Sequence, residues 1–129
     1  MKIHKHLLVD GTIRNPISDP EVINAWLAEL VDKVDMEIFM EPRSKYCDDP
    51  TNAGTTGVVV ITTSHASIHI WNDGDPAFFR ADLYSCKEFD PQVVLAHFAV
   101  FDPIELDYSL IDRTQHPHTI CKQGKIFYD

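Results

Sequence analysis

The sequence predicts an α/β (α+β) fold, a two-layer sandwich in which two helices cover one face of a largely antiparallel sheet. Three observations predict it. Apolar residues recur at helical spacing in one segment, a second helix start is signalled near residue 90, and the remaining apolar segments are short and β-branched or alternating. Most of the strands follow one another between the two helices, which favours antiparallel pairing. The 129 residues suffice for one core, so we expect a single domain over 1–129.

The first predicted elements are a strand and a helix. Residues 3–10 are short and partly apolar, and the Asp10-Gly11 pair that follows is typical of a turn. Ser18 and Glu21 match a capping box with proline in the first helical turn. The helix after it presents one apolar face, made of Val22, Ile23, Trp26, Leu27, Leu30, Val31 and Val34. These residues are expected to pack on the sheet.

The central segments predict strands and one long loop. Residues 37–41 form a short strand, and the Pro, Asp, Asn and Gly content of 42–54 predicts a loop. Residues 57–61 are continuously apolar and β-branched, as in a buried central strand. From Ala66 onward, apolar and polar residues alternate to Trp71, which places His69 on the face opposite the core.

The remaining elements are weaker in pattern. A turn at 72–76 leads into a strand at 78–84, and Asp90 with Pro91 caps a second helix. Residues 104–112 alternate as a last strand. The tail after this strand has no clear pattern and is expected to be loose.

Composition excludes several classes of protein. The formal charge is −9, from 20 acidic and 11 basic residues without a basic stripe, so nucleic acid is not an expected partner. No apolar run approaches the ~18 residues that cross a bilayer, so no membrane association is expected. The three cysteines, Cys47, Cys86 and Cys121, lack the density of a disulfide scaffold. A reduced, cytoplasmic location fits these features.

The chemistry-bearing stretch is Thr56-Gly-Val-Val-Val-Ile-Thr-Thr-Ser64-His-Ala-Ser-Ile-His69-Ile-Trp71, followed by Asp82-Leu-Tyr-Ser-Cys86. The ordered set resembles the small bacterial and phage S-adenosylmethionine decarboxylases. In that family a Gly-Val-Val-Val-Ile strand leads into Ser-His-x-x-Ile-His-x-Trp, and an Asp-x-x-x-Cys strand follows. His6-Leu-Leu-Val-Asp10 also looks like the family's opening strand.

The resemblance implies that the chain is a proenzyme that cuts itself. The Ser64 hydroxyl would attack the carbonyl of Thr63, and the resulting ester would break by β-elimination. By resemblance His69 transfers protons in this processing, and Thr56 stands where the family has an assisting serine. The products would be residues 1–63 and residues 64–129, with a pyruvoyl group at position 64.

The same resemblance implies the later chemistry. The pyruvoyl ketone would form a Schiff base with a small cationic amine, so no pyridoxal phosphate is needed. Cys86 matches the family's proton donor, and Asp73 stands where the family contacts the ribose hydroxyls. The product would be the aminopropyl donor for spermidine and polyamine biosynthesis. Family members commonly pair into homodimers of processed protomers.

Departures from the family pattern leave two alternatives open. Thr63 replaces a common glutamate, Asp73 is one methylene shorter than the usual residue, and the loop at 46–54 lacks the family's aromatic residues. Because these changes cluster at substrate recognition, a pyruvoyl-dependent decarboxylase of ornithine or arginine is one alternative. The other is an unprocessed homologue that binds or regulates without catalysis.

No metal site is predicted. His65 and His69 have the spacing of a zinc pair on a helix, but the apolar alternation here indicates a strand and supplies no third ligand. His116, His118 and Cys121 lie in a polar tail that needs no metal to explain it.

Overall fold

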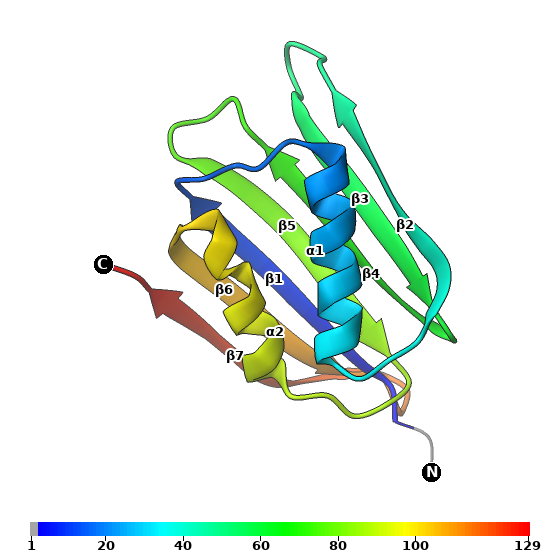
Figure 1. The fold of residues 1–129 in the computed structure, drawn as a ribbon. Coiled ribbons are helices and arrows are strands. Elements are labelled where there is room, and N and C mark those ends of the chain that lie inside the picture. The colour runs from blue at the N-terminus through cyan, green and yellow to red at the C-terminus, as the bar shows by residue number, and fades with distance from the viewer. Residues whose placement is uncertain (1–2) are drawn as a thin grey trace.

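The computed structural model describes residues 3–129 as one antiparallel sheet with two helices on a single face (Figure 1). The strand order is β2-β3-β4-β5-β1-β6-β7, and every neighbouring pair is antiparallel. This arrangement confirms the predicted fold class. The strands are β1 (Lys5–Ile13), β2 (Ile38–Cys47), β3 (Gly54–Ile61), β4 (Ser64–Trp71), β5 (Ala77–Ser85), β6 (Pro103–Asp112) and β7 (Thr119–Phe127). The helical elements are α1 (Pro20–Lys33), α2 (Pro91–Ala96) and the 3₁₀ turn η1 (His97–Phe101).

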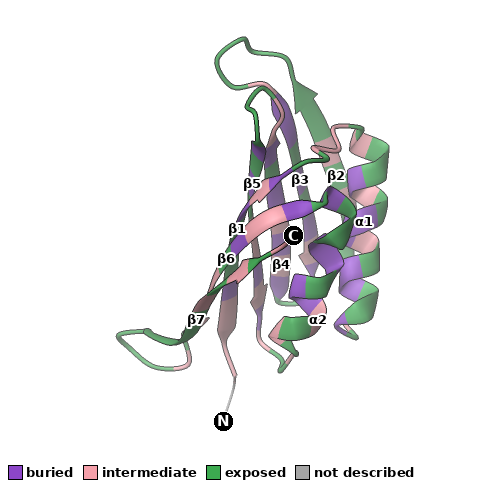
Figure 2. Ribbon diagram, turned by 90° about the vertical axis from the view of Figure 1, so that its left-hand side faces the viewer, coloured by how far each residue is buried: buried purple, intermediate pink, exposed green. Residues whose placement is uncertain are grey.

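The core lies between the helices and one face of the sheet. The predicted apolar face of α1 is buried at six positions: Ile23, Trp26, Leu27, Leu30, Val31 and, just after the helix, Val34. The prediction is wrong for Val22, which is 44% exposed in the first turn of the helix. Along β4, buried residues alternate with more exposed ones, because successive side chains of a strand point to opposite faces. The sheet face away from the helices, called the open face below, is covered by no element of the described chain (Figure 2).

The helix starts follow the capping rule, with one correction. Asp90 caps α2 as predicted, because its carboxylate accepts a hydrogen bond from the Gln92 N–H at 2.9 Å. The cap of α1 is Asp19 instead of the predicted Ser18, and it accepts from the Glu21 N–H at 2.9 Å. Asp19 immediately precedes Pro20, the first helical residue, so its side chain is the one in reach of the free N–H groups.

The predicted turn at Asp10-Gly11 is wrong, because β1 continues through both residues to Ile13. Gly11 does not form a turn; it allows the side chains of Phe79 and Leu106 to pack directly against the backbone of β1. A Cβ at this position would lie 2.5 Å from Phe79 Cε2 and 2.6 Å from Leu106 Cδ2. Only glycine leaves these two core side chains the space that they occupy.

Two segments predicted to be irregular are strands. The predicted loop at 42–54 is half strand, because β2 extends to Cys47 at the edge of the sheet. Register shifts in β2 between Met40 and Arg43 accommodate Pro42. The predicted loose tail instead forms β7, the opposite edge, along β6. Most of β7 is exposed, so its sequence carries little hydrophobic signal, and backbone hydrogen bonds to β6 hold it in place.

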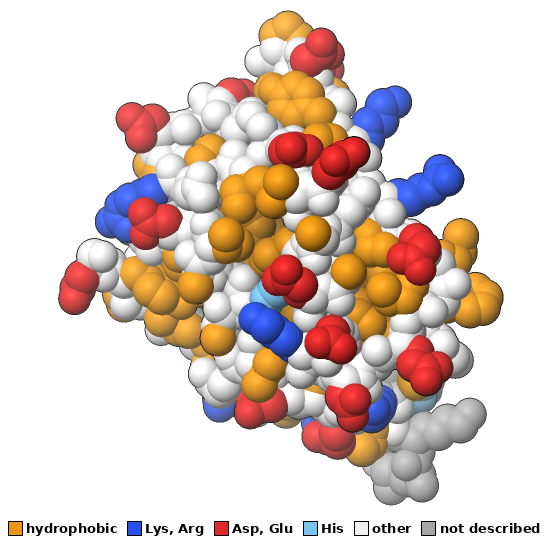
Figure 3. All heavy atoms as spheres, viewed as in Figure 1, with side chains coloured by type: hydrophobic (Ala, Val, Ile, Leu, Met, Phe, Trp, Pro, Cys, Tyr) orange, Lys and Arg blue, Asp and Glu red, His pale blue; other side chains and the backbone are white. Residues whose placement is uncertain are grey.

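The surface over the helices carries acidic side chains that do not form one continuous patch (Figure 3). Asp and Glu side chains are spread over this face, with hydrophobic groups between them and few Lys or Arg (Figure 3). Within residues 3–129, neither helix is long and apolar enough to cross a membrane.

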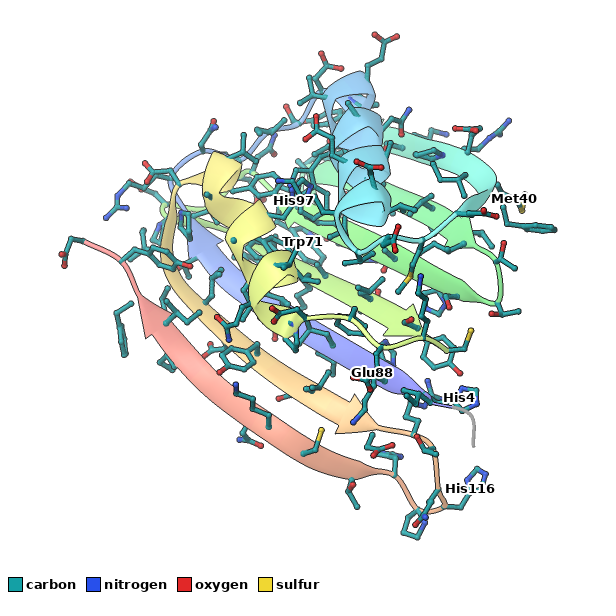
Figure 4. All side chains as sticks on the ribbon, turned by 60° about the horizontal axis from the view of Figure 1, so that its bottom comes forward. His4, Met40, Trp71, Glu88, His97 and His116 are labelled. Carbon is teal, nitrogen blue, oxygen red and sulfur yellow. The ribbon has the colours of Figure 1, made fainter. Side chains whose placement is uncertain are left out.

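His97 joins the two helices through contacts with Trp26 and Lys33. Its ring lies near α2 beside α1 (Figure 4), stacks on Trp26, and approaches the Trp26 carbonyl at 2.8 Å and Lys33 Nζ at 3.2 Å. Burial lowers the pKa of His97 below its ordinary value of 6.5. The hydrogen bond to Trp26 raises it in part, and the Lys33 ammonium lowers it further.

We therefore expect acid to destabilise the protein through His97. The pKa of His97 is lower in the folded than in the unfolded protein. Its contribution to the free energy of unfolding is therefore complete above the unfolded-state pKa and is lost as the pH falls through the folded-state pKa. Urea unfolding at about pH 7.5 and about pH 5.5 should show a lower midpoint in acid. His97→Gln, which retains a donor for the Trp26 carbonyl but does not titrate, should lose less on acidification. An equal loss in both proteins would assign the effect to other groups.

Candidate active site

Ser64 begins β4 at the tight turn that follows β3, and it is 6% exposed. The preceding residue, Thr63, has a φ of 61°, in the left-handed region that β-branched residues rarely adopt. Such a conformation costs on the order of 1–3 kcal/mol and often occurs at functional sites. The peptide bond between Thr63 and Ser64 is therefore at a strained point of the chain.

Cys86 lies directly beside Ser64, although the two are 22 positions apart in sequence. The Cys86 N–H donates to Ser64 Oγ at 3.1 Å, and Ser64 Oγ is 3.7 Å from Cys86 Sγ. Thr63 Oγ1 also contacts Cys86 Sγ. The antiparallel pairing of β4 with β5 explains this proximity, because the start of β4 lies against the end of β5. Three residues predicted for the site thus form one cluster, the Ser64–Cys86 cluster.

Two cavities meet at the Ser64 turn. The larger, of about 550 Å³, reaches Ser64 from the open face and is also lined by His65, Tyr84 and Arg113. The other, of about 480 Å³, is lined by Cys86 and carries the acidic residues Asp35 and Glu37 together with Lys87. Both volumes fall within the range of small-molecule sites.

Thr56 and His69 form a second group. They are directly opposite each other on β3 and β4, and Thr56 Oγ1 lies 3.0 Å from His69 Nδ1. The His69 ring stacks on Trp71, with centroids 5.9 Å apart. Thr56 and His69 are therefore neighbours across two adjacent strands.

The structure does not bring the second group to Ser64 within one chain. At a rise of about 3.3 Å per residue, the part of β4 between Ser64 and His69 is roughly 16 Å long. The side chains also point to opposite faces of the sheet, since Ser64 is buried toward the helices and His69 is exposed on the open face. Asp73 is exposed in the loop after Trp71, at the His69 end of the strand. The predicted site residues therefore fall into two groups at opposite ends of β4.

Sequence analysis did not identify the polar residues that surround His65 on the open face. His6 of β1 and His65 both approach Asp82 Oδ2, at 2.7 and 3.4 Å, and Ser67 donates to the other carboxylate oxygen. Burial by itself raises the pKa of the Asp82 carboxyl. The hydrogen bonds from His6 and Ser67, with the charges of both histidines, outweigh burial and hold this pKa below its ordinary value. Strand alternation places Ser67 and His65 on one face, but only strand pairing shows which β1 and β5 residues meet them.

Fold and site together define a class: an antiparallel α+β sandwich with a serine hydroxyl and a thiol in contact at a strained turn of its sheet. Residues 5–114 match the S-adenosylmethionine decarboxylase family, and the chain belongs to this family. It is similar to S-adenosylmethionine decarboxylase proenzymes from two type A strains of Clostridium botulinum. Each is 26% identical over 107 residues, covering 78% of this chain and 87% of the relative.

Solved structures agree on the fold. The adenosylmethionine decarboxylase of Aquifex aeolicus VF5 superposes with a TM-score of 0.68 at 22% identity, covering 84% of this chain and 88% of that one. The AdoMetDC-delta26 monomer of Trypanosoma brucei superposes with a TM-score of 0.55 at 14% identity, covering 84% of this chain and 45% of that one. At these identities the likeness concerns the fold.

Proposed function

We propose that the chain is a self-processing, pyruvoyl-dependent decarboxylase whose substrate is S-adenosylmethionine. The observation that carries the proposal is the Ser64–Cys86 cluster at the left-handed Thr63. Membership of the family supports the substrate class, and the proenzyme names of the Clostridium relatives support processing.

Processing would begin at Ser64 Oγ. The oxygen bonds to the Thr63 carbonyl carbon as the C–N bond breaks, which gives an ester and a free amine. Loss of the Ser64 α-proton then breaks the ester by β-elimination, and the Thr63 carboxylate leaves as the new end of residues 1–63. Water hydrolyses the imine that remains at residue 64, which releases ammonia and leaves the ketone. The Cys86 N–H donates a hydrogen bond that holds Ser64 Oγ in place. Holding a nucleophile close to its target can lower the activation free energy of the attack substantially.

A pyruvoyl group, once formed at position 64, supplies an electron sink that lets an amine substrate lose CO2. The site fits such a group, because Ser64 borders two cavities of small-molecule size. Cys86 Sγ lies 3.7 Å from Ser64 Oγ and is our proposed proton donor to the decarboxylated carbon. In the second cavity Lys87 pairs with Asp35 at 3.8 Å, which leaves the carboxylate of Glu37 to favour a cationic substrate such as a sulfonium.

We also infer that the working unit is a homodimer. Thr56 and His69 are too far from Ser64 in one chain to act on it, while the larger cavity is lined both by Ser64 and by His65 and Tyr84 of the open face. Pairing of two open faces about a two-fold axis perpendicular to the strands would bring His69 of a second copy to the Ser64 end of the first. Exposed apolar side chains on this face support such pairing: Leu8, Val58 and Phe78.

Intact-mass measurement tests the proposal. Purified protein should contain two fragments, residues 1–63 and residues 64–129, while Ser64→Ala should remain one chain. CO2 release should be fastest from S-adenosylmethionine when it is compared with ornithine and arginine. A single uncut mass for the unaltered protein would favour the non-catalytic homologue, and faster release from ornithine or arginine would reassign the substrate.

A further inference from the structure

Three side chains meet on the open face, outside the Ser64–Cys86 cluster. His6 and His65 lie on either side of Tyr84, since both are paired with it across β5. Asp82 is two residues earlier on β5 and therefore on the same face. Each of the three residues offers one ligand atom within 4.8 Å of the others. We call His6, His65 and Asp82 the open-face triad.

Two imidazoles and one carboxylate are a ligand set for divalent first-row transition metals. With metal–ligand bonds of about 2.1 Å, neighbouring ligand atoms are roughly 3 to 3.5 Å apart. In the triad, Asp82 Oδ2 lies 2.7 Å from His6 Nε2 and 3.4 Å from His65 Nε2. The two histidine nitrogens lie within 4.8 Å of each other, so the imidazoles must turn toward each other to surround an ion.

The surroundings orient the triad as metal ligands are usually oriented. Ser67 Oγ donates to Asp82 Oδ1, which leaves Oδ2 directed at the histidines. The Tyr84 ring packs against both imidazoles, with centroids 5.6 Å from His6 and 5.7 Å from His65. Three neighbouring strands thus hold the ligands on a rigid surface.

We propose that the open-face triad binds a divalent transition-metal ion of the Zn²⁺, Co²⁺ or Fe²⁺ type. The absence of metal predicted from the sequence rested on pairing His65 with His69, whereas the sheet places His65 beside His6 and Asp82 instead. The ion would retain open coordination positions, and His65 also lines the larger cavity at Ser64. The proposal does not depend on processing or on the substrate.

Arg113 distinguishes the metal-free and metal-bound states. Its Nη1 lies 3.3 Å from His6 Nδ1, and its guanidinium lies over the Tyr84 ring. A donated hydrogen bond here leaves the His6 proton on Nε2, the atom that faces Asp82. Metal at Nε2 requires this proton on Nδ1, so the guanidinium must turn away. Because Arg113 is exposed and its turning would cost the contacts with His6 and Tyr84, its removal should favour metal.

Co²⁺ titration of full-length Ser64→Ala protein tests the site by calorimetry and by visible ligand-field absorption. We expect one Co²⁺ per chain, displaced by Zn²⁺. His65→Gln and Asp82→Asn should each weaken binding by more than about 100-fold, beyond the roughly 10- to 100-fold typical of supporting residues. Ser67→Ala should fall within that range. Arg113→Gln should bind as tightly as its parent or more tightly.

The competing histidines provide the control. His4 and His116 lie at the same end of the molecule (Figure 4) and line a cavity with His118. A double variant, His116→Gln with His118→Gln, should leave Co²⁺ affinity and absorption unchanged. The proposal is overturned if no Co²⁺ binds, if His65→Gln and Asp82→Asn bind normally, or if the double variant loses the ion. If Asp82→Asn does not fold, the Arg113→Gln variant supplies a further test, because weaker Co²⁺ binding by this variant than by its Ser64→Ala parent would contradict the proposed site.

Discussion

Cys86→Ser should still cut itself between Thr63 and Ser64 but should decarboxylate about 10²- to 10⁴-fold more slowly, the usual contribution of a positioned acid or base. Processing should survive because Ser64 Oγ is held by the backbone N–H of Cys86, which serine retains. Turnover should suffer because a hydroxyl is a much weaker acid than the thiol that lies 3.7 Å from Ser64 Oγ.

Intact mass and CO2 release on the same preparation separate the two effects. Cys47→Ser is the matched control, since this cysteine is exposed in the edge strand β2 and lines neither cavity at Ser64. It should match the parent in both measurements. Full activity in Cys86→Ser would exclude the thiol as proton donor, and an uncut chain would place Cys86 in processing instead.

Phe79→Ala should lower the free energy of unfolding by about 3–5 kcal/mol, the usual cost of removing a buried phenyl ring. Phe79 is 0% exposed and stacks on Phe98 at 4.8 Å and on Phe101 at 5.9 Å. It therefore joins β5 to the α2–η1 segment. A loss of this size is a large part of the 5–15 kcal/mol typical of a domain.

Urea unfolding followed by circular dichroism measures this loss. The Ser64→Ala background keeps the chain in one piece, so that a two-state transition can be analysed. Phe127→Ala is the control, since Phe127 is 75% exposed on β7 and its removal should change stability by less than about 0.5 kcal/mol. Similar losses for the two variants would contradict the position of Phe79 at the centre of the core.

The local elements were readable from the sequence because their signals are local. The apolar face of α1 repeats at helical spacing, and Asp90 followed by Pro91 marks the start of α2. The β-branched run of β3 and the alternation in β4 likewise depend on near neighbours. With the family resemblance, these signals also indicate Ser64 and Cys86 as site residues, without any record of the contact between them.

Tertiary structure alone decided what depends on pairing between distant strands. The sequence around Gly11 is typical of a turn, and only the folded structure shows that Gly11 makes room for the side chains of Phe79 and Leu106. The sequence of β7 carries no strand pattern, because this strand is held by its hydrogen bonds to β6. Strand register likewise separates His69 from Ser64 and gathers His6, His65 and Asp82 on the open face. The physical reason is that register is fixed by hydrogen bonds and packing between segments far apart in the chain, which local sequence patterns do not record.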